Sequence, residues 1–545
     1  MAPRSEESGP VLHQPRIRRN DYSVLIPPQL GEWTPTLDVS VVIPAHGNAD
    51  KLPLVLAALA AQSYPERLMQ TVVVDDGSDP PLTLPEIRPE RTRIVRPDPS
   101  VWGPGGAVNT GVAVSEGAVV LRLDSDMLIH RDHVESQLRW HHRADYLGVI
   151  GDKRFVDFTP GDLSAQEAFE AVRDGRAAEL FGRDNGPEVW IERILNRTDR
   201  LRSEGPRAYR VFTGATCSVR RELFDAVGGM DPTLLLGEDV ELGYRLAQAG
   251  VVFIPELGAG AWHLGEARTR MRHEEATRYR IPSVGHRIPD SDLRRDIRGR
   301  RWQVPYVDAV IDVGDHPWER VRDTVDGLLT GEVDDVRVTL VGPWAELDAD
   351  ERRAPLDDPR LDLRLLRETY RTDDRVRFGD VPPVRDGAVP FRFTLPADSR
   401  PTRWALRTLI ETADRERAGL VGVLLRGSGE EAPYPRLERT AAFARAYRLG
   451  ATAADVDRLV DEIYGVRWVD GDGVFADDRE HREPTPCCAC QEKLEDARRQ
   501  AGRERIRAER ERARADRYDR QLRWLRESPS PGLWRRILPE RWSRD

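Results

Sequence analysis

The chain has 545 residues, of which 39% are hydrophobic and 32% are charged, and its formal net charge is -10. Because single hydrophobic cores usually stop growing near about 250–300 residues, this length predicts at least two folded domains. The negative charge argues against a nucleic-acid-binding surface, which is normally basic, and the longer apolar runs fall far short of the roughly 20 residues of a membrane-spanning helix.

Residues 1–37 form the first segment of the chain, and they are polar and rich in proline. This composition predicts an arm that lies across a folded domain. The first 20 residues lack the apolar core of a secretory signal, and the whole chain has four cysteines, too few for a disulfide scaffold. Both observations favour a cytoplasmic, reducing location.

Strands and helices alternate along residues 38–300. The β-branched run DVSVVIPAH is followed by the helical pattern KLPLVLAALAAQ, by the strand MQTVVVDD, and later by the helix and strand of GAVNTGVAVSEGAVVLRLDSD. Such alternation predicts an α/β fold with a mostly parallel sheet, whose ligands bind beyond the carboxyl ends of the strands. Acidic residues stand at those ends.

Asp124 and Asp126 follow the apolar strand AVVLRL, so their carboxylates can converge on one cation. Carboxylates that leave water positions open suit Mg²⁺ or Mn²⁺, and such a cation offsets the charge that develops on a departing nucleoside diphosphate. An isolated Asp-x-Asp also arises by chance in acidic proteins. Its position directly after a buried strand is what favours a metal site.

Three further sets of residues each fit either a functional role or a purely structural one. Asp75 and Asp76 fit hydrogen bonding to a base or ribose, or an ordinary turn. Asp239, with Glu238 before it, begins a helix, where it fits either a general base or a helix cap. His263 fits either a metal ligand or a structural imidazole.

Taken together, these motifs resemble the inverting family-2 glycosyltransferases of GT-A fold over about residues 39–266. The matching segments are VSVVIPAHGN, the QSYP that ends the first helix, VVVDDGS, VNTGVAVSEGAVVLRLDSD, TGATCSVRRELFDAVGGMD, and GEDVELGYRLAQAG followed by a histidine. Several linked motifs across one domain make a specific signal. The resemblance implies that residues 38–300 form a GT-A domain that moves a sugar from a nucleotide-sugar donor to an acceptor hydroxyl with inversion.

The resemblance also implies roles for individual residues. The residues expected to bind the donor are Pro44, Asp75, Asp76, Asn109 and Asp124. The expected ligands of a divalent metal, Mn²⁺ or Mg²⁺, are Asp124, Asp126 and His263. The residues expected on the acceptor side are Asp239 as the general base, Glu238 beside it, and Thr213 and Gly214 in the acceptor pocket.

The chain departs from the family pattern at Val108, which precedes Asn109 where the family often has Arg, so contacts to phosphate or to a loop are expected to differ. It also lacks the QxxRW element and the membrane helices of processive polysaccharide synthases, which favours a non-processive enzyme. The expected acceptor is a glycan or a lipid-linked glycan of cell-surface polysaccharide or cell-wall synthesis. A small molecule or a protein is the alternative acceptor.

Two other functions are weighed against the transferase. The first is a non-catalytic scaffold of a glycan-assembly complex, and the intact acidic motifs weigh against it. The second is a nucleotidyltransferase, which would need a basic, glycine-rich loop for a triphosphate. The GPGG at residues 103–106 has no Lys or Arg nearby for that task.

Residues 301–478 repeat the same order of elements, with VDAVIDVGD, WERVRDTVDGLLTG and DVRVTLVGPW. The later segment RPTRWALRTLIETADRERAGLVGVLL parallels the GAVNTG helix and the strand after it, but it ends in RGSGEE rather than DSD. We therefore predict a duplicated, smaller GT-A-like domain that has lost its metal site. Two unrelated α/β domains are the alternative.

Residues 479–545 contain a long charged helix over 491–527 with a thin apolar seam, which fits a coiled coil between two copies of the chain or a solvated single helix. Cys487, Cys488 and Cys490 lack the paired motif of a metal site, which favours contact between subunits or no role. The final GLWRRILPERW fits either a peripheral contact with the anionic inner face of a membrane or docking on the protein's own body.

Overall fold

The computed structural model describes residues 14–181, 186, 189–289, 299–348, 354, 357–425 and 434–476. These residues belong to one compact unit. The charged helix, the three neighbouring cysteines and the amphipathic end expected in residues 479–545 lie outside the described residues, so those expectations stay predictions. Across the part that is described, no helix combines the length and the apolar character needed to cross a bilayer.

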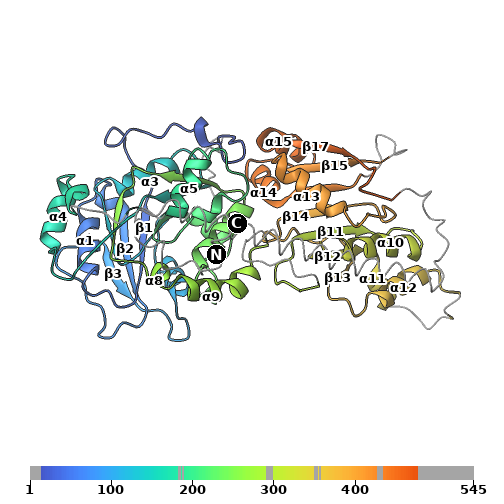
Figure 1. The fold of residues 1–545 in the computed structure, drawn as a ribbon, viewed down its shortest axis with the longest axis horizontal. Coiled ribbons are helices and arrows are strands. Elements are labelled where there is room, and N and C mark those ends of the chain that lie inside the picture. The colour runs from blue at the N-terminus through green and yellow to red at the C-terminus, as the bar shows by residue number, and fades with distance from the viewer. Residues whose placement is uncertain are drawn as a thin grey trace, which may run out of the picture. The chain divides into compact units, whose positions relative to one another are not determined.

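The first α/β region contains a seven-stranded sheet in the order β3-β2-β1-β4-β8-β6-β9. Its strands β3, β2 and β1 are labelled in Figure 1. Its strands are β1 (Val39–Ala45), β2 (Met69–Asp75), β3 (Thr92–Val95), β4 (Val119–Leu123), β6 (Leu147–Gly151), β8 (Thr216–Arg220) and β9 (Val252–Glu256). β8 runs antiparallel to both of its neighbours, and the other recorded pairs are parallel. The mostly parallel sheet predicted from the sequence is confirmed, and the carboxyl ends of its parallel strands meet at one edge.

Helices cover both faces of this sheet. In β1, Val41 and Ile43 belong to the apolar cluster of α1 (Leu52–Ala60), whereas Val42 belongs to the cluster of α2 (Pro104–Ala113). Strands that are buried on both faces favour such continuous runs of β-branched residues. The remaining helices of the region are α3 (His133–His141), α4 (Ala165–Arg173), α5 (Val189–Arg197), α6 (Arg221–Ala226), α7 (Glu238–Gln248), α8 (Arg268–Met271) and α9 (His273–Gly285).

A smaller sheet joins β5 (Met127–Ile129), β10 (Ala261–Leu264) and β7 (Arg154–Val156) in that order. β5 begins directly after Asp126, and the main-chain N–H of Leu264 donates to the carbonyl of Asp126. His263 on β10 pairs with Met127 on β5. This small sheet therefore brings His263, distant in sequence, beside the Asp-x-Asp motif.

The second α/β region contains another seven-stranded sheet, in the order β13-β12-β11-β14-β16-β15-β17. Its strands are β11 (Val307–Asp312), β12 (Val336–Val341), β13 (Val376–Gly379), β14 (Phe391–Thr394), β15 (Leu420–Leu424), β16 (Arg436–Arg439) and β17 (Val466–Asp470). Its helices are α10 (Trp318–Leu329), α11 (Trp344–Asp348), α12 (Leu361–Thr369), α13 (Ala405–Arg415), α14 (Thr440–Arg448) and α15 (Val456–Ile463). As in the first sheet, the fifth strand in spatial order, β16, is antiparallel to both neighbours.

The shared strand order corrects one correspondence drawn from the sequence. The segment RPTRWALRTLIETADRERAGLVGVLL forms α13 and β15, which occupy the places of α3 and β6 in the first sheet, not those of α2 and β4. The counterpart of β4 is β14, because each pairs in parallel with the central strand of its sheet. The error arose because helix–strand pairs with similar periodicity look alike in sequence.

The strand register then identifies the residues that replace the acidic motif. Val119 pairs with Val39 and Phe391 pairs with Val307, so Thr394 stands where the first sheet has Arg122. Counting on along the chain, Pro396 replaces Asp124, and Asp398 keeps the acidic character of Asp126. The same counting along β2 and β12 puts Gly342 and Pro343 at the positions of Asp75 and Asp76.

The described part of the N-terminal arm, residues 14–37, contacts both α/β regions. The side chain of Asn20 donates to the carbonyls of Leu201 and Phe253 and accepts from the N–H of Phe253. Arg445 on α14 is 2% exposed. Its guanidinium donates to main-chain carbonyls of the arm and of the loop after α7, namely those of Ile17, Arg19, Gly250 and Val251.

Two buried histidines on α3 connect this helix to β8. His133 contacts the hydroxyl of Thr216 through Nε2 at 2.5 Å and the carbonyl of Gly260 through Nδ1 at 3.0 Å. Nε2 of His141 lies 2.9 Å from the hydroxyl of Ser218. Burial lowers the pKa of His133 to about 4 and lowers the pKa of His141 as well. Both imidazoles are therefore neutral in the folded protein at neutral pH.

This burial predicts a loss of stability in mild acid. As pH falls below about 6.5, the unfolded chain takes up a proton at His133 while the folded chain does not, so the free energy of unfolding decreases until pH reaches about 4. The His133 share of that loss is about 3 kcal/mol. The His133→Gln variant should not show this part of the loss in urea unfolding. Its free energy of unfolding should therefore rise relative to that of the natural chain as pH is lowered from 7 to 4. Parallel pH curves for the two proteins would contradict the assignment.

Candidate active site

A cleft of about 520 Å³ lies at the carboxyl edge of the first sheet. The loops after β1, β2 and β4 supply most of its lining, and β10 adds one side. Its polar lining residues include His46, Asn48, Lys51, Asp76, Arg122, Asp124, Ser125, Asp126, His263 and Glu266. The edge predicted to bind ligand is thus a cavity with several convergent charges.

The guanidinium of Arg122 lies at the buried end of this cleft. Nη1 and Nη2 each lie 3.2 Å from one carboxylate oxygen of Glu238, and Nε lies 3.4 Å from Asp124. Burial alone would lower the pKa of Arg122, but the carboxylates of Asp124, Glu238 and Asp239 raise it. Burial, together with the charge of Asp239, raises the pKa of Glu238 to about 7, while Arg122 opposes that rise.

Asp239 is held by main-chain donors at the start of α7. One carboxylate oxygen accepts from the N–H of Gly214 and the other from the N–H of Val240, both at 2.8 Å. A Cβ at position 214 would lie 2.2 Å from Cζ of Arg122, so only glycine fits there without moving the guanidinium. Gly214 therefore joins Asp239 to the Arg122 end of the cleft.

The metal ligands predicted from the resemblance are only partly assembled. Among the described residues, no three His, Cys, Asp or Glu side chains already converge as a metal site. Oδ1 of Asp126 lies 3.7 Å from Nε2 of His263, and Nδ1 of His263 lies 2.9 Å from the carbonyl of Gly265. With Nδ1 as the donor, Nε2 keeps its lone pair for a ligand. This donor set fits a divalent cation bound by one or two carboxylates together with substrate phosphates.

The charges around Asp126 support that fit. Burial raises the pKa of Asp126, while His263 and Lys51 oppose that rise. Nζ of Lys51 lies 4.0 Å from Oδ2 of Asp126. A partly buried carboxylate whose neighbouring imidazole and ammonium lie 3.7 Å and 4.0 Å away is a favourable place for a cation.

The predicted donor-binding residues fall into two groups. Pro44, Asp76 and Asp124 line the cleft. Asp75 does not, because its carboxylate accepts from the N–H groups of Ser78 and Leu82 and from Arg96. Asn109 is also outside the lining, and both atoms of its amide bond the main chain of Met230. In this structure Asp75 and Asn109 brace the loops beside the cleft.

The first sheet has a second cavity, of about 220 Å³. The ends of β6 and β9, helix α5 and Thr213 line it. Asp152 and Lys153 supply charged groups, and burial raises the pKa of Asp152. Thr213 lines this cavity, and the adjacent Gly214 packs on Arg122 and donates to Asp239, which is among the lining residues of neither cavity.

An unusual turn forms part of the wall of the second cavity. Asp199, Arg200 and Leu201 have φ values of 46°, 51° and 69°, so three successive residues are left-handed. Such residues normally occur singly, at a cost of about 1–2 kcal/mol each. The arm stabilises the turn, since Tyr22 donates to the carbonyl of Arg200 and Asn20 to that of Leu201.

Comparison with known proteins identifies the domain that carries these features. Residues 40–228 match the model of "Glycosyl transferase family 2". These residues belong to glycosyl transferase family 2. The α/β fold predicted for the family-2 domain agrees with the observed sheet.

Curated relatives match part of the chain. A pre-mycofactocin glycosyltransferase of Mycobacterium tuberculosis is 30% identical over 218 residues, which are 39% of this chain and 40% of that protein. The succinoglycan biosynthesis protein ExoO of Rhizobium meliloti is 32% identical over 237 residues, 42% of this chain and 61% of that protein. The chain thus spans about two-fifths of the length of the first of these relatives.

A solved structure is also similar to part of the chain. It is the mannosyltransferase PcManGT from Pyrobaculum calidifontis in complex with GDP-Man and Mn²⁺. The TM-score is 0.31 at 18% sequence identity, over 47% of this chain and 66% of that one.

The cleft of about 520 Å³ is also lined by residues that the sequence did not identify as candidates. Arg122 had one signal, namely a lone basic residue inside the apolar strand that precedes the Asp-x-Asp motif. Lys51 is one of three lysines in the chain, which could have drawn attention to it. His46 contacts the carbonyl of Asp76 at 2.7 Å, and Asn48 donates to Ser125 at 2.9 Å. Neither contact has a signature in the sequence.

The buried position of Arg122 predicts a strong coupling with Glu238. Arg122→Met leaves buried carboxylates without their counter-charge, which should reduce the free energy of unfolding by about 3–5 kcal/mol. The loss should be smaller at pH 6 than at pH 8, because Glu238, whose pKa is about 7, then becomes neutral. Urea unfolding at the two pH values measures both effects.

A double-mutant cycle with Glu238→Gln provides the control. Because the two side chains are in direct contact, the double variant should be more stable than the sum of the single losses predicts, by about 1 kcal/mol or more. Additive losses at both pH values would show that the two groups do not interact.

Proposed function

We propose that the family-2 domain transfers a sugar from a nucleotide-sugar donor to an acceptor hydroxyl, with inversion at the anomeric carbon. The observation that carries the proposal is the cleft in which Asp76, Asp124 and Asp126 meet Lys51 and His263. Its volume of about 520 Å³ suits a small-molecule site. The mixture of carboxylates and cations suits the sugar, ribose and diphosphate groups of such a donor.

Asp239 is the proposed general base. The acceptor oxygen attacks the anomeric carbon, its proton passes to the Asp239 carboxylate, and the bond from the anomeric carbon to the diphosphate oxygen breaks. A single carboxylate on the acceptor side is sufficient for an inverting displacement, because no sugar–enzyme bond forms. Two main-chain hydrogen bonds orient Asp239, and its bond to Gly214, the neighbour of Thr213 in the second cavity, supports this role.

Glu238 has a different proposed role. It is 5% exposed and bonded to Arg122, so we assign it to positioning the acidic groups rather than to contact with the acceptor. Asp126 and His263 are the proposed metal ligands, with Asp124 beside them. When bound, the divalent cation would offset negative charge on the leaving diphosphate. Lys51, near Asp126, adds a positive charge on the donor side.

The acceptor is proposed to occupy the cavity of about 220 Å³ beside Thr213. Its apolar wall on α5 and its polar groups, Asp152 and Lys153, suit a sugar ring, which has both apolar faces and hydroxyls. Among the curated relatives are a hyaluronan synthase and a chondroitin synthase of Pasteurella multocida. The names of these relatives support a glycan as the acceptor class.

We also propose that the second sheet arose by duplication and does not bind the donor. The identical strand order supports the duplication. The replacement of Arg122 by Thr394 and of Asp124 by Pro396 removes the charges on which the donor site depends. Gly342 stands at the position of Asp75 in the first sheet. Two residues further along the chain, Trp344 is 5% exposed.

Calorimetric titration and a transfer assay test the transferase. A panel of nucleoside diphosphates is titrated with Mn²⁺ or with chelator, and nucleoside diphosphate release from the matching sugar nucleotides is followed with oligosaccharide acceptors. Asp126→Ala should abolish metal-dependent binding. Asp239→Asn should keep that binding and reduce transfer by about 10²–10⁴-fold, since it removes the base alone.

Asp398→Ala is the matched control, because strand register makes Asp398 the counterpart of Asp126 in the second sheet. It should bind and transfer like the natural chain. Loss of binding in Asp398→Ala but not in Asp126→Ala would move the donor site to the second sheet. No binding by the natural chain under any condition would favour the non-catalytic scaffold.

A further inference from the structure

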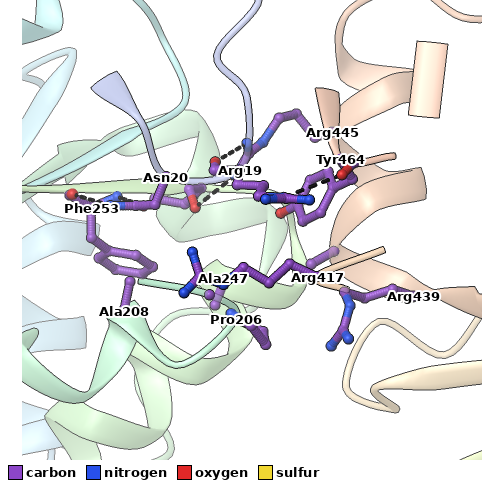
Figure 2. A pocket seen from close by; sticks show the side chains of 13 residues that line it. Arg19, Asn20, Pro206, Ala208, Ala247, Phe253, Arg417, Arg439, Arg445 and Tyr464 are labelled. Atoms are coloured by element: carbon purple, nitrogen blue, oxygen red, sulfur yellow. Dashed lines mark hydrogen bonds between the residues drawn. The ribbon is translucent and has the colours of Figure 1, made fainter. Parts of the chain in front are cut away.

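A small cavity of about 20 Å³ lies where the arm meets the end of α7 and the second sheet. Figure 2 shows Arg19 and Asn20 from the arm on one side and Arg417, Arg439 and Arg445 on the other. The volume exceeds the roughly 10–15 Å³ that one water molecule needs and is too small for a sugar ring. The cavity therefore fits one small group.

The cavity is lined by four guanidinium groups, and no carboxylate is among its described lining residues. Asp414 pairs with Arg439. For Arg19, Arg417 and Arg445, no carboxylate partner is recorded among the residues that the structure describes; Arg19 and Arg445 bond main-chain carbonyls instead. Burial, and the charges of Arg18, Arg417 and Arg467, lower the pKa of Arg19.

Arg417 adds a conformational observation. It follows the C-terminal end of α13 with a φ of 53°, in the left-handed region. Its N–H donates to the carbonyl of Asp414, and the N–H of Ala418 donates to that of Ala413. These two bonds form a Schellman motif, in which glycine is the usual residue at the position of Arg417. A strained arginine whose side chain lines a cavity points to a function for that side chain.

We propose that this cavity binds one phosphate-type oxyanion. Arginine is the side chain best suited to such a group, because its planar fork donates two parallel hydrogen bonds to oxyanion oxygens. Within the part of the chain that the structure describes, no side-chain hydrogen bond of Arg417 is found, and Arg439 uses Nε and Nη2 but not Nη1. The anion balances the unpaired cations and joins the arm, the α7 end and the second sheet. This site does not depend on the proposed sugar transfer.

Thermal unfolding of the full chain tests the proposal. Melting temperatures are measured in sodium chloride, in sodium orthophosphate and in glycerol phosphate, all at one ionic strength. Orthophosphate should raise the melting temperature of the natural chain in a saturable manner, as a ligand that binds only the folded state does. An equal rise with glycerol phosphate would identify a phosphate monoester as the ligand, and no rise with it would identify the free ion.

Arg417→Gly is the decisive variant, because glycine adopts the left-handed conformation without strain. In chloride it should melt at the same temperature as the natural chain or higher, and the saturable effect of phosphate should be lost. Arg415→Ala, which removes a neighbouring exposed arginine, is the control and should keep the phosphate effect. Phosphate also stabilises proteins unspecifically. An equal phosphate effect in all three proteins, or no effect in the natural chain, would overturn the proposal.

Discussion

The buried guanidinium of Arg122 holds together the parts of the site that carry negative charge. It comes from β4 and contacts Asp124, which directly follows that strand, and Glu238 at the start of α7. Gly214 packs against it and donates to Asp239. Without this cation, the buried carboxylates would lack a counter-charge inside the protein, which is far more costly than losing a surface ion pair. The strand β4, the start of α7 and the segment at Gly214 therefore all contact one side chain.

The two sheets separate what sets the fold from what sets the chemistry. Both have the same strand order and the same single antiparallel strand, and both keep β-branched and aromatic residues inside. Two of the charges are not kept, since Thr394 and Pro396 stand at the places of Arg122 and Asp124, whereas Asp398 stands at the place of Asp126. Apolar burial suffices to preserve the architecture, whereas the charged residues of a site can change without loss of the fold.

Much of the site could be predicted because sheet geometry is simple. Parallel strands end at one edge, so Asp76, Asp124 and Asp126 were expected together, and they line one cleft. The contact of Arg122 with Glu238 could not be predicted, because 116 residues separate them and neither has a periodic signal. The donor-binding role of Asp75 stays a prediction. A carboxylate at a strand end serves a turn as readily as a ligand, and here it bonds Ser78 and Leu82.

The most direct test of the account is the position of a bound cation. Crystals of the full chain grown with Mn²⁺ and a nucleoside diphosphate should show anomalous scattering of manganese in the cleft, beside Asp126 and His263, with the diphosphate on the Lys51 side. A manganese peak at the second sheet, or well-ordered nucleotide bound away from Asp126, would contradict the central claim that the charges around Arg122 form the donor site.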